Sequence, residues 1–527
     1  MLKKKGGRTI SKMIAPVLIL IFLIYCLLDN GLVIQSTPFR QTNDLQSKKI
    51  LLIPLDSRPV NTSYVSILGG IAGIEVIYPR LGLDLYTQPC DFPVIENFLM
   101  KHIPSVDGVI IGIPEWLNGG MIEARNAQSY VKNQYRIDQL KEILSRYPDK
   151  KVYLINLIPR ETPSYTLNSF NYRDEIISFG KMVDEFCTTK LNNKDKLWAR
   201  LKQMERPSTT PYIDEYINLF EENYKVTREL MTWVQLGIAD ELLIGMDDTS
   251  ATGMTKVTER RIKDYIHQKS IKNVTLMAGA DELSSLILAR YKNELTQKGS
   301  NYSITYSCSS DKNKIFPYDG RSVALVVKEK IDYIQPFHST HDLPLELYIH
   351  SSEEPITDLV QWTTTHKNEL KGVANLAFAF TPITWMEEFF QNDLDQQIES
   401  FSGWNTAANT LGLLIAHMEM IKDIPTWSDR HAKWVSLRYI EDYYYNLNKR
   451  KEYSSTFSPF CTLNLLEEEE LTTELCQESN NLLQNLSIVT RQDEKKYSRP
   501  SPYDVTHIDL PWNRIYEISC SFTPKGN

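Results

Sequence analysis

Two pairs of adjacent acidic residues stand where apolar runs of this sequence end. Asp247 and Asp248 follow residues 241–246, and Asp281 and Glu282 follow residues 274–279. Carboxylates held close together differ in pKa, so one can donate a proton while the other stays ionised. Glycosidic cleavage needs such a pair, and beside an N-acetylated sugar one acid can orient the acetamido group while the other protonates the leaving oxygen. We predict that all four acids are catalytic; the alternative is that they cap and start helices.

The candidate binding residues also follow apolar runs or glycines. Asp56, Arg58 and Asn61 come after residues 50–54, and such an Asp–Arg pair suits either a clamp on an anionic or hydroxyl-rich ligand or a structural ion pair. The further candidates are Glu115 after residues 108–114, Arg125 after a Gly-Gly turn, Arg160 after residues 152–158, and Trp404, Asn405, Asn409, Trp512 and Arg514 near the carboxyl terminus. Aromatic faces beside amide and guanidinium donors suit sugar binding, whereas packed tryptophans and helix caps are the alternative.

The apolar runs that precede these residues predict the fold. Near-continuous apolar strands are typical of parallel sheets covered by helices on both faces. Weaker strand candidates are residues 74–79, 302–307, 332–335 and 373–380, and helical stretches alternate with all of them. We therefore predict an α/β fold with a mostly parallel sheet, either (β/α)8-barrel-like or doubly wound in tandem. In both, the strand carboxyl ends form the ligand crevice, so Asp56, Asp247 and Asp281 belong on one edge.

The pattern changes along the 527 residues. Residues 49–400 form the predicted α/β body, in which residues 192–240 read as an inserted helical excursion. Residues 401–527 form a mainly helical carboxyl-terminal region, with helices expected over 403–422, 431–451 and 465–486 and a short strand over 515–522. We expect this region to pack on the body rather than to fold alone.

The amino terminus has the composition of an export signal. Five basic residues up to Lys12 precede an uncharged apolar run over residues 13–28. This pattern predicts a signal anchor over residues 1–30, held with its positive side in, and a linker over residues 31–48. The body would then lie outside the cytoplasm, held by a single-pass membrane anchor. The alternative is that the signal is cleaved and the protein is secreted.

The composition of the chain and the motifs that it lacks argue against several classes of function. The net charge of −8 argues against a nucleic-acid partner, because no basic stripe would neutralise phosphates. The chain contains no Walker loop, no G-x-G-x-x-G and no G-x-S-x-G sequence, and its seven cysteines include no C-x-x-C pair. His338, His341 and Asp342 are three potential metal ligands within five residues. A metal site there is an alternative to our prediction of no metal and no cofactor.

Several of these motifs occur together in an order that resembles one family. They are Pro-Leu-Asp-x-Arg-Pro-x-Asn at 54–61, Gly-Gly with Arg at 119–125, Asp-Asp with Gly at 247–253, Ala-Gly-Ala-Asp-Glu at 278–282, Gly-Trp-Asn-Thr-x-x-Asn-Thr-Leu-Gly at 403–412, Arg-x-x-Glu-Asp at 438–442 and Pro-Trp-x-Arg-x-x-Glu at 511–517. Over residues 50 to 520 the chain is similar to the bacterial domain-of-unknown-function family 4127. The resemblance implies an α/β protein and no particular activity. Where it implies an Asn-Gly-Ala-Asp run, this chain has Thr381 to Thr384, so a crevice carboxylate is missing.

These observations predict an exported, cell-surface carbohydrate-active hydrolase. It would act on N-acetylated glycans or cell-wall polymers through its paired carboxylates, with a membrane as its second partner through the amino-terminal anchor. One alternative is a non-catalytic surface glycan-binding protein. The other is a metal-dependent hydrolase that uses His338 and His341.

Overall fold

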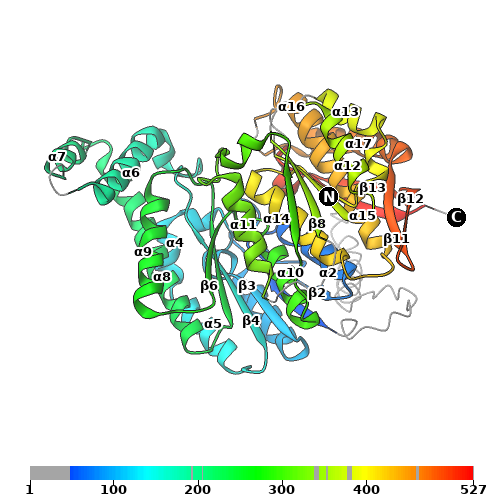
Figure 1. The fold of residues 1–527 in the computed structure, drawn as a ribbon. Coiled ribbons are helices and arrows are strands. Elements are labelled where there is room, and N and C mark those ends of the chain that lie inside the picture. The colour runs from blue at the N-terminus through cyan, green and yellow to red at the C-terminus, as the bar shows by residue number, and fades with distance from the viewer. Residues whose placement is uncertain are drawn as a thin grey trace, which may run out of the picture. The chain divides into compact units, whose positions relative to one another are not determined.

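Two open parallel sheets form the framework of the protein (Figure 1). The structure is a computed structural model that describes residues 48–190, 194–204, 206–336, 344–351, 354–376, 383–458 and 462–525. The first sheet contains, in spatial order, β2 (Glu75–Ile77), β1 (Lys49–Ile53), β3 (Gly108–Gly112), β4 (Lys151–Ile158), β5 (Glu241–Met246) and β6 (Val274–Ala278). The second contains β10 (Ser400–Ser402), β9 (Leu370–Asn375), β8 (Leu345–His350) and β7 (Tyr302–Tyr306). Every neighbouring pair is parallel.

The prediction of an α/β protein with parallel strands is confirmed. The five apolar runs that end in polar residues form β1, β3, β4, β5 and β6. The weaker runs at 74–79 and 302–307 contain β2 and β7, and the run at 373–380 overlaps β9 up to residue 375, with residues 377–380 outside the described part. The strand predicted at 332–335 is wrong: residues 332–334 end α11 (Val323–Ile334), because the apolar residues before them recur at helical spacing.

The barrel alternative is not confirmed, because no closed sheet is found among the described strands. In the first sheet, the strand order reverses direction between β1 and β3. In open parallel sheets, ligands bind outside the strand carboxyl ends at such a reversal.

Helices cover both faces of the first sheet (Figure 1). On one face, α2 (Ser63–Ile71) and α10 (Leu283–Thr296) pack against each other and against α14 (Ala407–Ile421). On the other, α3 (Phe92–His102) contacts β1, while α8 (Thr210–Gln235) and α9 (Met254–Lys269) contact β4. The remaining helices of this part are α4 (Ala127–Asn133) and α5 (Tyr135–Ser145).

Helix α14 connects the two sheets. It contacts α10 and α2 beside the first sheet and β9 and β10 of the second, and all fifteen of its residues are buried. A helix with apolar residues on every side is stable in such an interior position, where its few polar side chains find hydrogen-bond partners. The helix expected over 403–422 is thus confirmed, and it lies in the core. Helices α12 (Ile356–Thr365) and α13 (Ile383–Gln391) belong to the second sheet's connections.

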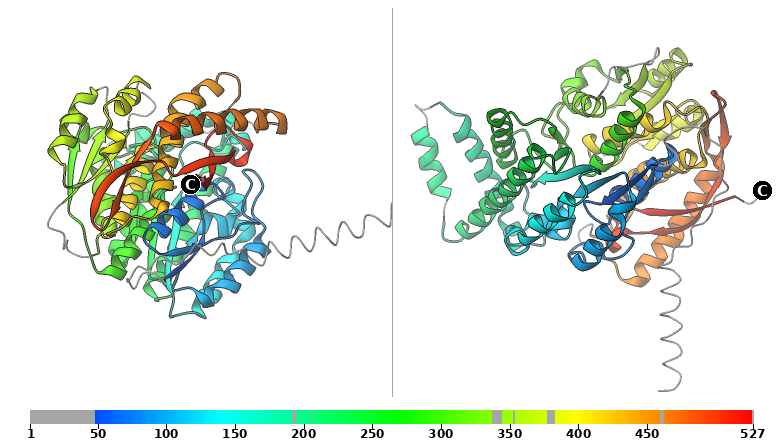
Figure 2. Two further views of the ribbon diagram at one scale, coloured as in Figure 1. Left: turned by 90° about the vertical axis from the view of Figure 1, so that its right-hand side faces the viewer. Right: turned by 90° about the horizontal axis from the view of Figure 1, so that it is seen from below.

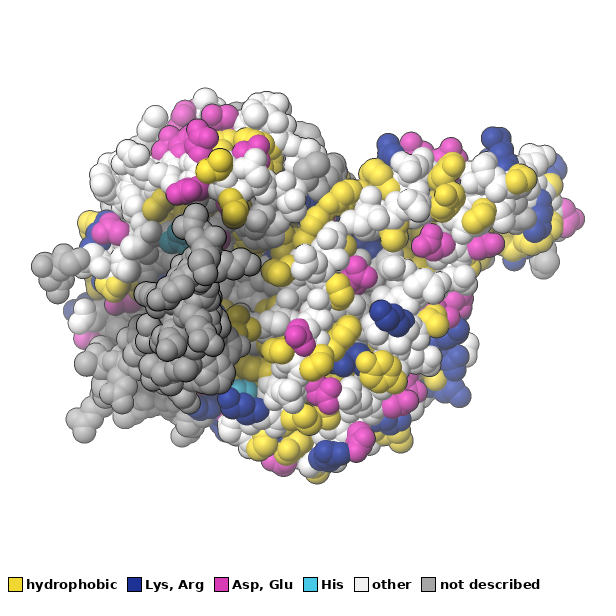
Figure 3. Space-filling model, turned by 180° about the vertical axis from the view of Figure 1, so that it is seen from behind, with side chains coloured by type: hydrophobic (Ala, Val, Ile, Leu, Met, Phe, Trp, Pro, Cys, Tyr) yellow, Lys and Arg dark blue, Asp and Glu magenta, His cyan; other side chains and the backbone are white. Residues whose placement is uncertain are grey.

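The helical excursion expected between β4 and β5 is also confirmed. It consists of α6 (Arg173–Thr188), α7 (Lys194–Met204) and α8. Figure 2 shows α6 and α7 extending away from the first sheet. On the face drawn in Figure 3, lysine and arginine side chains are interspersed with acidic ones.

The carboxyl-terminal region contains more strand than expected. Its helices are α15 (Asp429–Arg438), the π-helical η10 (Tyr439–Lys449), α16 (Arg450–Tyr453) and α17 (Leu465–Asn485). Two antiparallel hairpins follow: β11 (Ser487–Gln492) with β12 (Lys495–Pro500), and β13 (Tyr503–Asp509) with β14 (Ser519–Pro524). The first turn is made by Asp493 and Glu494, whose φ angles of 49° and 66° suit a two-residue hairpin. Asp-Glu is not one of the dipeptides that mark such a turn in a sequence, so the hairpin could not be predicted from it.

The predicted anchor and nearly all of the linker, residues 1–47, lie outside the described part. Within the described ranges, no helix combines the length and apolar character needed to cross a membrane.

Candidate active site

The carboxyl ends of β1, β3, β4, β5 and β6 bring the predicted polar residues to one edge of the first sheet. Arg58, just beyond β1, is the link between two of these strand ends. Its Nε donates to Asp56 Oδ2 at 2.8 Å, and its NH2 donates to Asp281 Oδ1 at 2.5 Å. Asp56 and Asp281 therefore lie together, as the parallel sheet predicts.

Amide groups complete this arrangement, which we call the deep cluster: Asp56, Arg58, Asn61, Asp281 and Asn409. Asn61 Nδ2 donates to Asp56 Oδ1 at 2.8 Å, and Asn409 Nδ2 reaches Asp281 Oδ2 at 3.5 Å. All five side chains are buried. Burial raises the pKa of Asp281 to about 6 and Arg58 opposes this rise, whereas the charges of Asp56 and Asp247 add to it. Asp281 does not cap α10, since the N-cap position belongs to Glu282, whose side chain makes no capping hydrogen bond.

Glu282 points into the protein core rather than to the deep cluster. Its carboxylate pairs with the Lys330 ammonium of α11, and both side chains are fully buried. Gly412 of α14 lies so close that a Cβ there would overlap the Glu282 side chain. The structure therefore places Glu282 in a buried ion pair between α10, α11 and α14.

The other acidic pair is more accessible. Asp247 Oδ2 accepts a hydrogen bond from Arg125 NH2 at 2.9 Å, and Asp248 Oδ2 lies 2.7 Å from Arg160 NH2. We call these two contacts the outer pairs. The side chains of Asp247 and Asp248 are 13% and 24% exposed. Asp248 has a φ of 36°, so the extended chain has already ended and the usual alternation of faces no longer applies.

The surroundings shift the pKa values of the two outer acids in opposite directions. Burial raises the pKa of Asp247, but Arg125 and Arg160 outweigh it and hold that pKa below its usual value. Burial raises the pKa of Asp248, and although Arg160 opposes the rise, the charge of Asp247 adds to it. Asp247 is therefore the stronger acid of the two and Asp248 the weaker.

A carboxyl-terminal segment, residues 511–517, covers the deep cluster; we call it the strap. Its Trp512 Nε1 donates to Ser57 Oγ at 2.8 Å, and its ring centroid lies 5.2 Å from the Arg58 guanidinium carbon. Glu517 Oε1 lies 3.7 Å from Arg58 Nε, and burial raises the pKa of Glu517 to about 8. Arg514 stacks on Tyr86, 4.2 Å from its ring centroid. The strap thereby closes the deep cluster from the side of β1.

Two predicted sugar-binding residues have structural partners instead. The Trp404 ring is buried, and its Nε1 donates to Glu441 Oε1 at 3.2 Å. It therefore presents no open face on which a sugar could stack. Asn405 Oδ1 accepts a hydrogen bond from Tyr516 of the strap at 2.9 Å.

Asp84 also lies at this edge of the sheet, and it was not among the residues predicted from the sequence. Its Oδ1 accepts the Ser57 N–H at 2.6 Å, and its own N–H donates to Glu115 Oε1 at 3.1 Å. The predicted binding residue Glu115 therefore lies behind Asp84, and both are buried. Burial raises the pKa of both carboxyls well above the usual range; the charge of Asp56 adds to the rise at Asp84, and the charge of Asp84 adds to the rise at Glu115. Asp84 follows no apolar run, so only its place in a loop after β2 could have indicated it.

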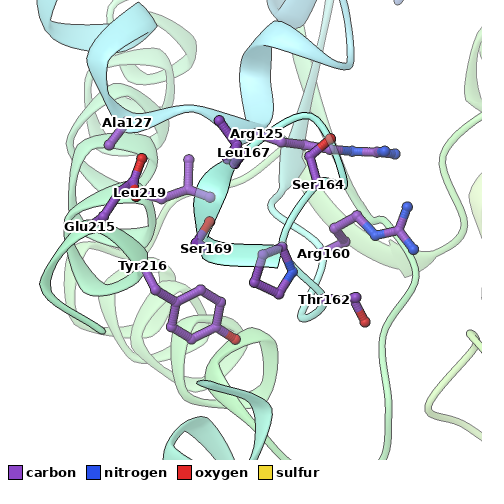
Figure 4. Close-up of a pocket in the computed structure, with 11 residues that line it drawn as sticks. Arg125, Ala127, Arg160, Thr162, Ser164, Leu167, Ser169, Glu215, Tyr216 and Leu219 are labelled. Atoms are coloured by element: carbon purple, nitrogen blue, oxygen red, sulfur yellow. The ribbon is translucent and has the colours of Figure 1, made fainter. Parts of the chain in front are cut away.

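A pocket adjoins the outer pairs (Figure 4). Its empty volume of about 340 Å³ includes open solvent. The lining residues are Arg125, Ala127, Arg160, Thr162, Pro163, Ser164, Leu167, Ser169, Glu215, Tyr216 and Leu219. Figure 4 shows the guanidinium groups of Arg125 and Arg160 pointing the same way, away from the α8 residues Tyr216 and Leu219.

The described part of the chain contains no group of three or more His, Cys, Asp or Glu side chains placed to hold a metal ion. His338, His341 and Asp342, the predicted alternative ligands, lie outside the described residues, as does Thr381. Thr384 is exposed on α13.

Comparison with known proteins agrees with the order of the motifs. A family model described as a protein of unknown function (DUF4127) matches residues 50–521. Comparison with curated proteins and with solved structures found no match. The matched range includes every strand end that builds the site, together with α14 and the strap. The chain therefore belongs to the DUF4127 family.

Proposed function

We propose that the protein is a hydrolase of N-acetylated glycans in which Asp247 and Asp248 carry the chemistry. The observation that supports this most is that the pKa values of two adjacent acids, both partly exposed beside a pocket, are shifted in opposite directions. Paired acids whose environments push their pKa values apart are the usual basis for acid and base roles. Asp281 and Glu282, which are buried and paired, are less suited to contact a substrate.

The reaction would use the substrate's own acetamido group. The ionised Asp247 accepts the acetamido N–H and orients its carbonyl oxygen, which attacks the anomeric carbon as the glycosidic C–O bond breaks. Asp248 gives its proton to the leaving oxygen. Asp248 then takes a proton from water, which attacks the anomeric carbon and releases the acetamido oxygen.

The deep cluster and the strap position this pair. Arg58 connects the ends of β1 and β6, and its charge also acts on Asp247 and Asp248. On this proposal, the two open sheets are doubly wound units in tandem. The amino-terminal basic and apolar segments hold the body outside the cytoplasm, where cell-wall polymers are the available substrate. Protease added to intact cells should then degrade the body.

Leaving-group dependence tests the roles of the two acids. Asp248→Asn should lower the rate on natural glycans by about 10²- to 10⁴-fold. It should affect aryl N-acetylglycosides much less, because an acidic phenol leaves without protonation. Asp247→Asn should slow both substrates, because it removes the group that orients the nucleophile. Glu221→Gln, which removes the ion-pair partner of Arg261 and does not line the pocket, is the control. Near-normal turnover in both Asn variants would exclude the proposal.

A non-catalytic glycan-binding protein is the second candidate. It is favoured by one observation: each outer acid is already held by an arginine in the structure. Glycan binding with no release of reducing ends, unchanged in Asp248→Asn, would support this candidate instead.

A further inference from the structure

We infer that the pocket in Figure 4 is a subsite for an acidic group of the substrate, either a carboxylate or a phosphate, bound by Arg125 and Arg160. This inference rests on the proposed hydrolase function and names its substrate class: an anionic glycan. Two guanidinium groups at one end of a pocket suit a carboxylate or phosphate better than a sugar hydroxyl.

The two arginines have donors to spare. A guanidinium carries five N–H donors. The contacts of Arg125 and Arg160 with Asp247 and Asp248 are made by one terminal nitrogen each. The Nε of each is buried and has no hydrogen-bond partner among the described residues. An unpartnered buried donor is costly, so a ligand that accepts these hydrogen bonds is favoured.

The rest of the pocket suits a group attached to a sugar. Ser164 and Ser169 contribute hydroxyls, and Leu167 and Leu219 contribute apolar surface. The Tyr216 hydroxyl from α8 is buried and also lacks a partner within the described ranges. Planar, two-pronged recognition by arginine favours carboxylate and phosphate over a hydroxyl.

The charges around the pocket define where the acidic group can lie. Arg125 and Arg160 carry two positive charges, and each contacts one acidic partner, Asp247 or Asp248, through a single terminal nitrogen. Glu161 accepts a hydrogen bond from Ser250 at 2.6 Å, and burial raises the pKa of its carboxyl. Glu215 on α8 would repel an anion. The acidic group is therefore expected at the arginine end, opposite α8.

Anion binding can be measured without any turnover. We would titrate the full-length protein with inorganic phosphate and with acetate at constant ionic strength, and follow the melting temperature. The expected result is saturable stabilisation of the wild type by at least one anion. Arg125→Gln and Arg160→Gln should weaken it at least tenfold. Arg146→Gln, which removes an exposed helical ion pair, should not.

A charge-preserving variant covers the case in which the Gln variants do not fold. Arg160→Lys keeps a cation beside Asp248 but loses the fork, so anion affinity should still fall, by about tenfold. Equal stabilisation of the wild type, Arg160→Lys and the Gln variants would overturn the inference, as would no stabilisation of the wild type by either anion.

A comparison of substrates distinguishes whether the acidic group is a carboxylate or a phosphate. Uronate-containing oligosaccharides should be favoured over neutral ones if a carboxylate binds, and phosphate-bearing oligomers if a phosphate binds. The Gln variants should raise KM for the favoured acidic substrate by a larger factor than KM for neutral N-acetylated oligosaccharides. Equal KM values for neutral and acidic substrates would reject the subsite while leaving the hydrolase standing. If the Gln variants lost anion binding but the wild type hydrolysed no substrate, the anion subsite would stand and the hydrolase proposal would fall.

Discussion

Arg58 and Asp281 are separated by 223 positions in the chain, yet their side chains form a buried hydrogen-bonded ion pair with an NH2 to Oδ1 distance of 2.5 Å. The contact joins the ends of β1 and β6, which lie on either side of β3, β4 and β5 in the first sheet. The contact therefore links two strand ends at the edge where the site lies. The same Arg58 guanidinium also pairs with Asp56.

Removal of this guanidinium should destabilise the protein. Arg58→Gln leaves Asp56 and Asp281 buried without their cation, and breaking a buried pair typically costs about 3–5 kcal/mol. The free energy of unfolding from urea titration measures the effect. Arg58→Gln with Asp281→Asn should recover part of the loss, because it removes one uncompensated charge. A loss below about 1 kcal/mol in the single variant would mean that the pair is not buried as described.

Gly412 tests the packing around Glu282. Alanine in place of glycine inside a helix normally stabilises a protein, by roughly 0.5–1 kcal/mol. Here the new Cβ would overlap the Glu282 side chain, so Gly412→Ala should instead destabilise by about 1–3 kcal/mol. Gly403→Ala, between β10 and α14, is the steric control, because its Cβ would meet nothing closer than 3.5 Å. If Gly412→Ala raises the melting temperature, the close contact of α14 with α10 is wrong.

Glu517 should make the strap sensitive to alkaline pH. Burial raises its pKa to about 8, whereas an unfolded glutamate titrates near 4.3. Because the folded state favours the protonated form, this contribution to stability is complete below the unfolded pKa and is lost as the pH rises towards 8. A pKa difference of one corresponds to about 1.4 kcal/mol.

Glu517→Gln should therefore lose less stability than the wild type between pH 5 and pH 9. Urea unfolding across that range measures the difference, with the exposed Glu452→Gln as control. Parallel stability curves for wild type and Glu517→Gln would show that this carboxyl is not shifted.

A chain of buried hydrogen bonds predicts acid sensitivity elsewhere. His431 Nε2 must donate to the Val489 carbonyl at 2.8 Å, so its Nδ1 accepts from His417 Nε2 at 3.1 Å. His417 Nδ1 then accepts from Ser400 Oγ at 2.7 Å. Burial lowers the pKa of His431 to about 4 and that of His417 well below its usual value. Stability is thus complete above about pH 6.5 and is lost as the pH falls towards 4.

His417→Gln can keep both hydrogen bonds without a titrating ring. Its unfolding free energy should fall less steeply than that of the wild type between pH 6.5 and pH 4. His267→Gln, at an exposed helix end, serves as the control. A slope as steep as that of the wild type would place the acid-sensitive group elsewhere.

The sequence by itself determined the strands of the first sheet and the edge on which the site lies. Continuous apolar runs must be buried on both faces, and a parallel sheet sends all their carboxyl ends to the same edge. The polar residues that end those runs, from Asp56 to Asp281, therefore had to lie at that edge. The order of the motifs was enough to identify the family.

Only the tertiary structure decided which acid is accessible. Asp248 and Glu282 look alike in the sequence, since each is the second acid after an apolar run. Glu282 is closed off by Lys330 and Gly412, whereas Asp248 faces Arg160 beside a pocket. The accessibility and the pKa of each acid depend on neighbouring side chains that come from distant segments of the chain. The spacing of the strands in the sequence does not reveal which side chains these are. The strap is the plainest case, because its contact with Ser57 joins residues 455 positions apart.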